Sequence, residues 1–523
     1  MNCCFDEMNL IHQPSCAMRL TVLSVLLACS VTTAAAQIDT NRPVRRLSLA
    51  ECIQMALQNN VDLEIRRYDP QIAEYELRAA YGVYDPAFSF SGQHSRDEAG
   101  SRLLGGGFSI PGSITEADRF SLGLGPGLTP WGMTYDLQGS VADSYGRSFS
   151  VDTNGFLVPL PFENSSGSAQ ISLTQPLLRN FWIDGPRLAI RVAKNRLQYS
   201  ELALKLQVMQ TITRLEQAYY DLIFARQSVE VQRMAVELAE QLVEENRKRV
   251  EVGALAPLDA KQAESQAATS RADLIAALSQ LAVQENVVKQ LITSNYAEWA
   301  NMGLEPTGTL TAPRREFDLQ ESWRKGLTLR PEILQAKLDV ERAGIQLKYD
   351  RNQVWPQVDL FATYGYNGSG AEFSGSLYEI ERRDRPFYSF GGRVSIPLSN
   401  VSARNAVESS KATLQQAVLN VKRWERDIMR AIDDDVKQAQ ASYERVAATR
   451  AAREYAEEAL AAEQKKLEQG KSTTFLVLQM QRDLTAARAQ EIQALDAYNK
   501  ALSQLSLDEG TTLERLGIDF RVE

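Results

Sequence analysis

The residue types that carry chemistry are sparse in this sequence, and their spacing forms no catalytic or metal-binding motif. Only two of the 523 residues are histidines, His12 and His94, so a histidine-based metal centre is not expected. We find no phosphate-binding loop, no nucleophile elbow and no zinc-ligand spacing. The sequence therefore predicts a protein that is not an enzyme and that needs no cofactor or metal.

Charged residues are plentiful, but they accompany long helical stretches. Many carboxylates stand four positions from a Lys or Arg, the spacing of ion pairs along one helix. The run Asp433-Asp434-Asp435 covers several directions of a helix, which is typical of a solvated surface and also fits the lining of a tunnel. The net charge of -9 and the pI near 5.2 argue against a nucleic-acid partner, which would require a basic face.

The amino terminus has the pattern of an export signal. Arg19 precedes an apolar run over residues 20–29, and Ala34-Ala35-Ala36 offers a small-residue cleavage site. The run also ends on Cys29 in a sequence that resembles a lipoprotein cleavage box, so two processing routes fit. In either case Cys52 has no cysteine partner in the rest of the chain, and no intrachain disulfide is expected.

The stretch that organises the chain is a very long helix that occurs twice. A shift of 217 positions places Arg187 on Arg404 and Gly253 on Gly470 without a gap. Between Arg187 and Val252 there is neither proline nor glycine, and apolar residues recur every three or four positions. A helix of roughly 100 Å cannot bury its apolar stripe alone. We expect it to pack against further copies of the chain and against two shorter helices lying end to end, 257–292 and 331–354.

A second repeat, offset by 270 positions, flanks these helices. It places Leu49 on Leu319 and Pro86 on Pro356. Each copy reads as a short helix, a break and a second helix, after which Pro86 or Pro356 marks the junction between helix and strand. Pro70 occurs in the first copy only, and we expect it to shift the start of that second helix.

Beyond the two prolines the apolar period changes from helical to two. Leu360, Tyr364 and Phe390 belong to such alternating runs. Runs of about ten residues with aromatics, joined by Gly- and Ser-rich loops, are typical of membrane β-strands, and a soluble antiparallel sheet with one wet face shows the same pattern. The two offsets differ by 53 residues, so the first copy carries that surplus within 95–168. We interpret it as an additional hairpin, which either lengthens the wall of a barrel or decorates its outer mouth.

Short motifs occur in a fixed order along this duplicated plan: Leu49-x6-Ala56-Leu57-x2-Asn60, Pro86-x-Phe88, Gln175-Pro176-Leu177, and the turns at Gly253 and Gly470. In this order they resemble the TolC-type outer membrane efflux protein family, over about residues 47–515. The resemblance implies an α+β membrane protein. Duplicated long antiparallel helical hairpins would form a periplasmic α-barrel, and antiparallel strands would contribute to a shared trimeric transmembrane β-barrel, with a small mixed equatorial region between them.

The resemblance also implies a function and partners. The chain would be a homotrimeric exit duct of a tripartite efflux or type I secretion system, in the lipid of the outer membrane with a long periplasmic extension. It would conduct substrates passively from a periplasmic adaptor protein and an inner-membrane pump of the RND or ABC type. The residue patterns alone leave an alternative, a soluble periplasmic coiled-coil scaffold without channel activity.

The candidate site residues cluster at the helical turns farthest from the strands. A glycine at the end of a long helix is first of all a C-cap, and the resemblance adds contact with the adaptor. Family members often carry acidic residues just after the second turn, where this chain has Leu476 and Gln479, so an acidic ring would depend on Asp259. A carboxylate near a helix N-terminus is also favoured by the helix dipole. The predicted adaptor turns are Gly253, Ala254, Leu255, Gly470, Lys471 and Ser472, and the predicted gate residues are Asp259, Gln262, Leu476 and Gln479.

The predicted organisation of the whole chain follows from the two repeats. It comprises a signal peptide with an extended n-region (1–36), a linker (37–46), a first repeat (47–296) with the extra hairpin (95–168) and a long helical hairpin (187–293), an equatorial connector (297–316), a second repeat (317–510) with strands (357–397) and a helical hairpin (401–506), and a tail (511–523).

Overall fold

A computed structural model of the chain describes residues 43–103, 109–152, 156–253 and 256–519. The predictions made for the signal peptide, Cys29, Ala254 and Leu255 lie outside the described residues. Across these four ranges, no helix combines the length and the apolar content needed to cross a bilayer.

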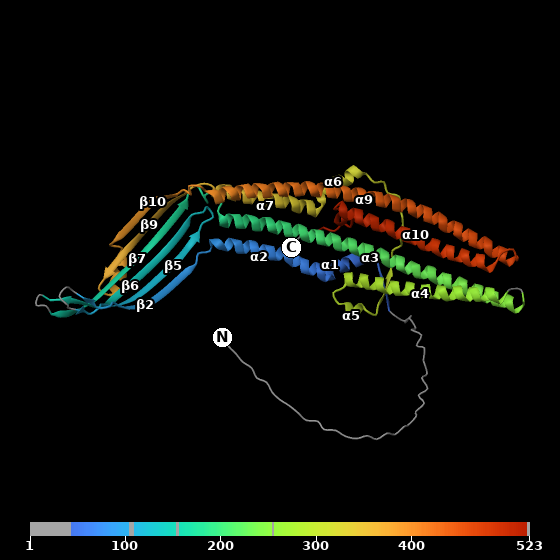
Figure 1. Ribbon diagram of the computed structural model, residues 1–523, viewed down its shortest axis with the longest axis horizontal. Coiled ribbons are helices and arrows are strands. Elements are labelled where there is room, and N and C mark those ends of the chain that lie inside the picture. Colours follow the sequence, from blue (N-terminus) through green and yellow to red (C-terminus); the bar gives the residue numbers. More distant parts are fainter. Residues whose placement is uncertain (1–42, 104–108, 153–155, 254–255, 520–523) are drawn as a thin grey trace, which may run out of the picture. The chain divides into compact units, whose positions relative to one another are not determined.

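Two long helical hairpins dominate the described chain (Figure 1). Helix α3 (Gly185–Glu251) has 67 residues and α9 (Val401–Glu468) has 68. Each packs against the helix that follows it, α4 (Pro257–Ile292) or α10 (Thr474–Asp508). The sequence resemblance between the two copies is therefore also a structural repeat.

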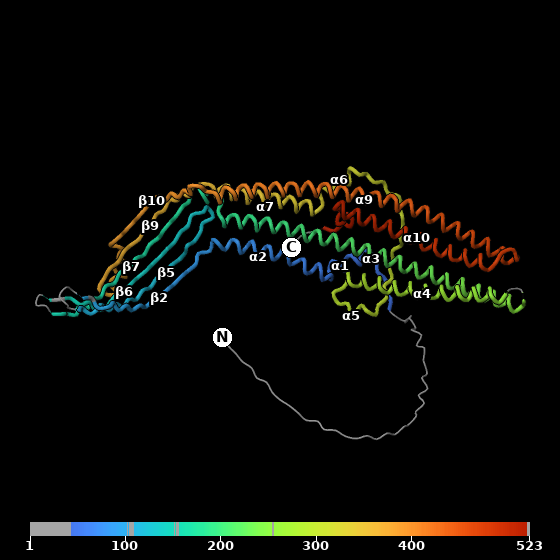
Figure 2. The backbone as a smooth tube through the Cα atoms, in the orientation of Figure 1, coloured from blue at the N-terminus to red at the C-terminus, as the bar shows by residue number. Residues whose placement is uncertain are grey.

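Shorter helices continue these hairpins toward the sheet (Figure 2). Helix α2 (Val61–Tyr81) packs on α3, and α7 (Pro331–Gln353) packs on both α9 and α3. The expectation that 257–292 and 331–354 would lie end to end was wrong in its pairing, because α2 continues the line of α4 while α7 continues the line of α10. Helix lengths can be predicted from the sequence, but they do not state which of two shorter helices of similar length packs on which long helix.

The break before α2 depends on one side chain. Helix α1 (Leu49–Asn59) ends where Asn60 accepts a hydrogen bond from the backbone N–H of Leu63 at 3.1 Å and donates one to the carbonyl of Leu291 at 3.0 Å. This cap fixes the start of α2 at Val61. Pro70 lies inside the continuous helix and is buried, so the expected shift of the helix start was wrong. Packing against α3 outweighs the hydrogen bond that the proline cannot donate.

A small mixed region surrounds the middle of the helices, as expected. A two-stranded parallel sheet pairs β1 (Val44–Leu47) with β8 (Gly303–Pro306). The hydroxyl of Tyr219, on α3, donates to the carbonyl of Leu47 at 3.0 Å and accepts from the N–H of Gly308 at 3.2 Å. The thiol of Cys52 is free and buried here. The other short elements of this region are α5 (Tyr296–Trp299), α6 (Leu319–Leu329) and α11 (Thr512–Arg515).

The strands form one antiparallel sheet of six, in the order β10-β9-β7-β6-β5-β2. The extra hairpin β5–β6 lies between β2 and β7, so it lengthens the sheet. Helix α8 (Phe373–Arg382) connects β9 to β10, a helix that the strand pattern did not predict. The six strands are β2 (Phe88–Glu98), β5 (Ile114–Leu128), β6 (Thr134–Val151), β7 (Leu157–Pro176), β9 (Gln357–Gly370) and β10 (Pro386–Ser395); the remaining short elements are η1 (Gly82–Tyr84), β3 (Arg102–Leu103) and β4 (Ser109–Ile110).

Candidate functional site

One face of the six-stranded sheet, called here the apolar face, carries a continuous row of large side chains. Directly paired residues point to the same side of a sheet. On this face Phe90, Tyr388 and Phe390 are respectively 68, 73 and 79% exposed, which is far more apolar surface than a sheet in water tolerates. The row that crosses all six strands consists of Phe88, Leu124, Leu137, Ile171, Tyr364 and Tyr388.

The opposite face, called here the polar face, has the reverse composition. Its hydroxyl groups pair between neighbouring strands: the Ser91 and Ser121 oxygens are 2.7 Å apart, and those of Ser172 and Thr363 are 3.2 Å apart. A representative row consists of Ser91, Ser121, Ser140, Ser168 and Asn367. A sheet that is apolar on one side and hydroxylated on the other separates lipid from water.

The height of the apolar face matches a membrane. On β9 the side chains of this face run from Val358 to Gly368. Ten residue steps on a strand tilted by about 40° span about 25 Å along the membrane normal. This is the height of the apolar band in outer-membrane barrels.

The two long hairpins turn at the end farthest from the sheet (Figure 1). Gly253 and Gly470 adopt φ values of 74° and 70°, in the left-handed region, and an added Cβ would meet no atom within 4 Å at either site. Their conformation, rather than crowding, therefore requires glycine. After Gly470 the backbone N–H of Lys471 donates to the carbonyl of Lys466 at 2.8 Å, which closes the end of α9.

Around the second turn a small polar network orders the chain. Ser472 donates to a carboxylate oxygen of Glu463, and Lys466 donates to the other at 2.8 Å. These two hydrogen bonds hold the pKa of Glu463 below its usual range. Thr473 caps α10 by accepting from the N–H of Leu476. Lys471 is left exposed beside this ordered turn.

The four predicted gate residues lie in the first turns of the returning helices. Gln262, Leu476 and Gln479 are exposed, and Asp259 is half-buried in the first turn of α4. Its carboxylate makes no hydrogen bond or ion pair with the part of the chain that the structure describes. The protomer therefore leaves all four positions available on its surface, at the same level in both copies.

Comparison with known proteins decides the family. The sequence profile described as outer membrane efflux protein matches residues 144–294 and 324–508, more than half of the chain. The chain belongs to the outer membrane efflux protein family. Its place is accordingly the outer membrane, with long helices extending into the periplasm.

Relatives and solved structures agree with this membership. The outer membrane efflux protein BepC of Brucella suis is 24% identical over 356 residues, which cover 68% of this chain and 74% of BepC. VceC from Vibrio cholerae shares the fold with 19% identity and a TM-score of 0.64, over 88% of this chain and 96% of its own. The Campylobacter jejuni outer membrane channel CmeC shares it with 14% identity and a TM-score of 0.63, over 90% of each chain.

In this outer membrane efflux protein the duplication extends to an ion pair that sequence reasoning missed. Arg271 contacts Glu240 at 2.5 Å across the first hairpin, and Arg488 contacts Glu457 at 2.6 Å across the second. Both pairs are related by the offset of 217 positions. The sequence predicts partners for these carboxylates on their own helices. The identical spacing in both copies is the signal that these two pairs cross the hairpin.

A stripe on α2 was also missed. Five large apolar residues recur with alternating steps of four and three, the heptad pattern of a helix seam, and all are 46 to 63% exposed. Helix α2 buries its other side, including Leu63 and Ala73, on α3. We call these five residues the α2 stripe: Val61, Ile65, Tyr68, Ile72 and Tyr75.

The triple-aspartate run divides between solvent and the interior. Asp433 pairs with Lys437 at 2.5 Å and Asp434 is exposed. Asp435 faces Asp508 at the end of α10, and Arg330 contacts Asp508 at 2.9 Å. Burial, and then the neighbouring Asp508, raise the pKa of Asp435 to about 8. When Asp435 is protonated, its carboxyl group can donate a hydrogen bond to Asp508, whereas two ionised carboxylates have no donor between them.

Proposed function

We propose that three copies of this chain close their sheets into one transmembrane barrel and their helices into a continuous tunnel, which forms a passive exit duct through the outer membrane. The observation that carries the proposal is the six-stranded sheet with an apolar face, a polar face and two open edges. Substrates would pass along the polar face, and the energy for their movement would come from another protein.

The open edges require a partner. Among the described strands β2 pairs only with β5, and β10 pairs only with β9. Unpaired backbone groups are not tolerated in hydrocarbon, and pairing β2 of each copy with β10 of the next removes every edge. Three copies of six strands make an eighteen-stranded barrel, with a backbone diameter of about 36 Å for strands about 4.8 Å apart and tilted by about 40°.

The α2 stripe supports the same assembly. Helix α2 leads through η1 into β2, so the stripe and the open edge of β2 belong to the same flank of the protomer. A second copy that pairs with β2 would therefore cover the stripe as well. In the alternative, a soluble scaffold, the α2 stripe would have no surface to pack against. That alternative would also expose Phe390 and Tyr388, on the apolar face, to water.

The duct is tested by imaging and by conductance. The purified protein in lipid nanodiscs should show, by electron cryomicroscopy, a trimer with eighteen strands, and it should give discrete conductance steps in planar bilayers. Deleting β5 and β6 (residues 114–151) should leave β2 beside β7 and yield twelve strands. As a control, replacing the turn 129–133 with a Gly-Ser turn should keep eighteen. A folded monomer in buffer without detergent, giving no conductance, would refute the duct.

We further propose that the turns at Gly253 and Gly470 dock onto a periplasmic adaptor linked to an RND- or ABC-type pump. They are the surfaces most distant from the sheet, and the ordered network at Ser472 presents Lys471 outward. A photo-crosslinker at Lys471 should capture a periplasmic protein in cells, whereas the same probe at exposed Lys348, near the sheet end of α7, should not. Equal capture at both positions, or at neither, would contradict docking at the turns.

A further inference from the structure

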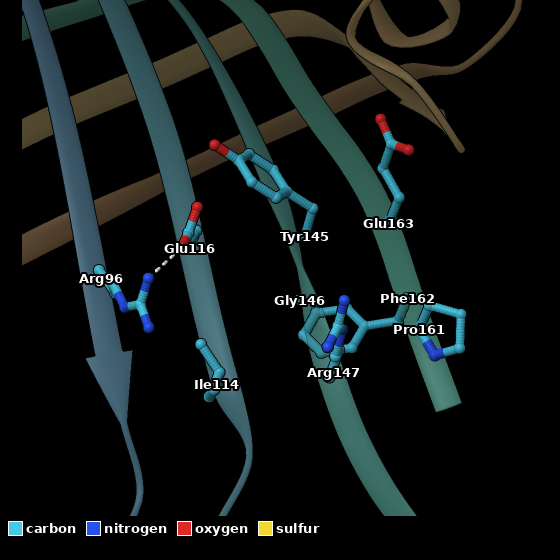
Figure 3. Close-up of a pocket in the computed structure, with 9 residues that line it drawn as sticks. All are labelled: Arg96, Ile114, Glu116, Tyr145, Gly146, Arg147, Pro161, Phe162 and Glu163. Atoms are coloured by element: carbon cyan, nitrogen blue, oxygen red, sulfur yellow. Dashed lines mark hydrogen bonds and ion pairs between the residues drawn. The ribbon is translucent and has the colours of Figure 1, made fainter. Parts of the chain in front are cut away.

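The apolar face of the sheet ends abruptly at one level. On the neighbouring strands β5 and β6 the last apolar row, which includes Phe120 and Val141, is followed two residues further out by Asp118 and Asp143. The next row places Glu116 opposite Tyr145. Figure 3 shows this charged zone, in which Arg96 donates a hydrogen bond to Glu116. Glu163 belongs to the same zone and lies on β7. These side chains line a shallow hollow of about 590 Å³. Hydrocarbon therefore stops between these rows, and lipid headgroups must lie at this level.

Helix α8 lies on the apolar face at that level. The Ser376 hydroxyl is 2.7 Å from the hydroxyl of Ser165, and the ring of Phe373 packs edge-on against Phe120 with centroids 5.8 Å apart. Both strand residues point to the apolar side of the sheet, since Ser165 pairs with Asp143 and Phe120 with Val141. The helix is thus outside the barrel wall, on the side that faces lipid.

The strands beneath α8 are built to receive a helix backbone. A Cβ added at Gly368 would lie 2.0 Å from the carbonyl oxygen of Ser376, and one added at Gly167 would lie 2.9 Å from Ile380. Gly370 approaches the helix backbone in the same way, with an added Cβ 2.9 Å from the Ser376 nitrogen. Three glycines on the same face remove the side chains that would hold α8 away. Its seat on the sheet is therefore specific.

The outward side of α8 combines apolar and cationic groups. Leu377 and Tyr378 are 44 and 57% exposed. At the end of the helix Arg382 pairs with Asp384 at 3.0 Å, and Arg385 pairs with Glu379 at 3.1 Å. Between them Arg383 adopts a left-handed conformation with φ of 61°. Within the described residues its guanidinium makes no hydrogen bond or ion pair.

We propose that α8 is an interfacial helix seated in the headgroup layer of the outer leaflet, where Leu377 and Tyr378 enter the boundary of the acyl chains and Arg383 binds a lipid phosphate. Amphipathic helices lie at this depth with aromatic and aliphatic residues toward the lipid, and the planar guanidinium matches phosphate oxygens. Residues 372–385 carry four acidic and three basic side chains, so the attraction is local to Arg383 and does not depend on net charge. The helix fixes the depth of the barrel in the outer leaflet.

The first test measures depth. A spin label at Leu377→Cys is compared with labels at Leu122→Cys, inside the apolar face, and at Glu98→Cys, beyond it, in vesicles that contain lipopolysaccharide. Labelling is selective because burial raises the pKa of the Cys52 thiol to about 12. The label at 377 should be accessible to oxygen to an intermediate degree, between the two references. If the oxygen accessibility of the label at 377 equalled that of the label at 98, the proposal would be overturned.

The second test measures the lipid. Native mass spectrometry should find about one phosphate-bearing lipid per chain retained on the wild type, at least a tenfold smaller occupancy on Arg383→Gln, and most of the occupancy on Arg383→Lys. Each variant is first shown to be folded by its heat-modifiable migration on gels. Equal retention on wild type and Arg383→Gln, or replacement of the bound lipid by millimolar inorganic phosphate alone, would overturn the phosphate contact.

Discussion

The α2 stripe gives the sharpest prediction about assembly, namely that replacing two of its residues weakens the trimer without unfolding the protomer. In the variant Ile65→Ser/Ile72→Ser, two isoleucines that are 58 and 53% exposed in the isolated protomer lose their apolar side chains. Neither faces α3, so the fold of the single chain should survive. Only burial against the neighbouring copy is lost.

The magnitude follows from the exposed fractions. Full burial of an isoleucine side chain contributes about 1.5–3 kcal/mol, so the half that remains to be buried contributes about 1 kcal/mol. Two positions then contribute about 2 kcal/mol per interface, and three interfaces about 6 kcal/mol per trimer, which corresponds to a dissociation constant raised by about 10⁴-fold.

The assay is the monomer–trimer equilibrium in detergent, measured by analytical ultracentrifugation over a range of protein concentrations. The matched control is Glu64→Ser/Gln71→Ser, one position earlier on the same helix with the same spacing of seven, where both side chains are exposed and polar. It should dissociate like the wild type. An Ile65→Ser/Ile72→Ser protein whose equilibrium matches that of the control would refute the assignment of the stripe to the protomer interface.

Two further predictions concern titratable groups. In bilayer recordings Asp259→Ala should weaken block by multivalent cations, because three copies of this carboxylate would meet at the tip. The control Asp273→Ala, which removes an exposed carboxylate further along α4, should leave the block unchanged. Equal block in Asp259→Ala and wild type would remove Asp259 from the gate. Asp435 keeps its proton in the folded state up to pH about 8 but loses it near pH 4 when unfolded, so wild-type stability should fall as the pH rises from about 4 to about 8. Thermal melts of Asp435→Asn should therefore show a gain over wild type that grows across this range and is absent at pH 4; a gain independent of pH would contradict the protonated pair.

Much of the helical architecture was predictable because it rests on local and repetitive features. The duplicated rods, the breaks at Asn60 and Arg330 and the glycine turns follow from propensity, capping and an unbroken offset. Pro70 shows where such reasoning fails, since a proline that weakens a helix locally is retained when packing on α3 stabilises it. The α2 stripe was present in the sequence as a heptad, but its meaning depends on knowing that α3 covers only the other side of the helix.

Helix α8 illustrates what a pattern of alternating residues hides. The sequence predicts the segment between β9 and β10 only as a connection between two strands, because its alternating neighbours give no helical period. Its helical state depends on a platform formed by Gly167, on another strand, together with Gly368 and Gly370. No window of the sequence contains these residues together with Ser165 and Phe120.

By itself the sequence determined the two copies, the lengths of the rods, the position of the turns and the two-residue period of the strands, because each of these is set by interactions within a few residues or by repetition. Only the tertiary structure decided that the extra hairpin joins the sheet, that α2 rather than α7 continues α4, and that a helix lies against the outside of the sheet. These choices depend on contacts between residues more than two hundred positions apart, such as Asn60 with Leu291 and Ser165 with Ser376. Local sequence does not encode which distant partner a surface will meet.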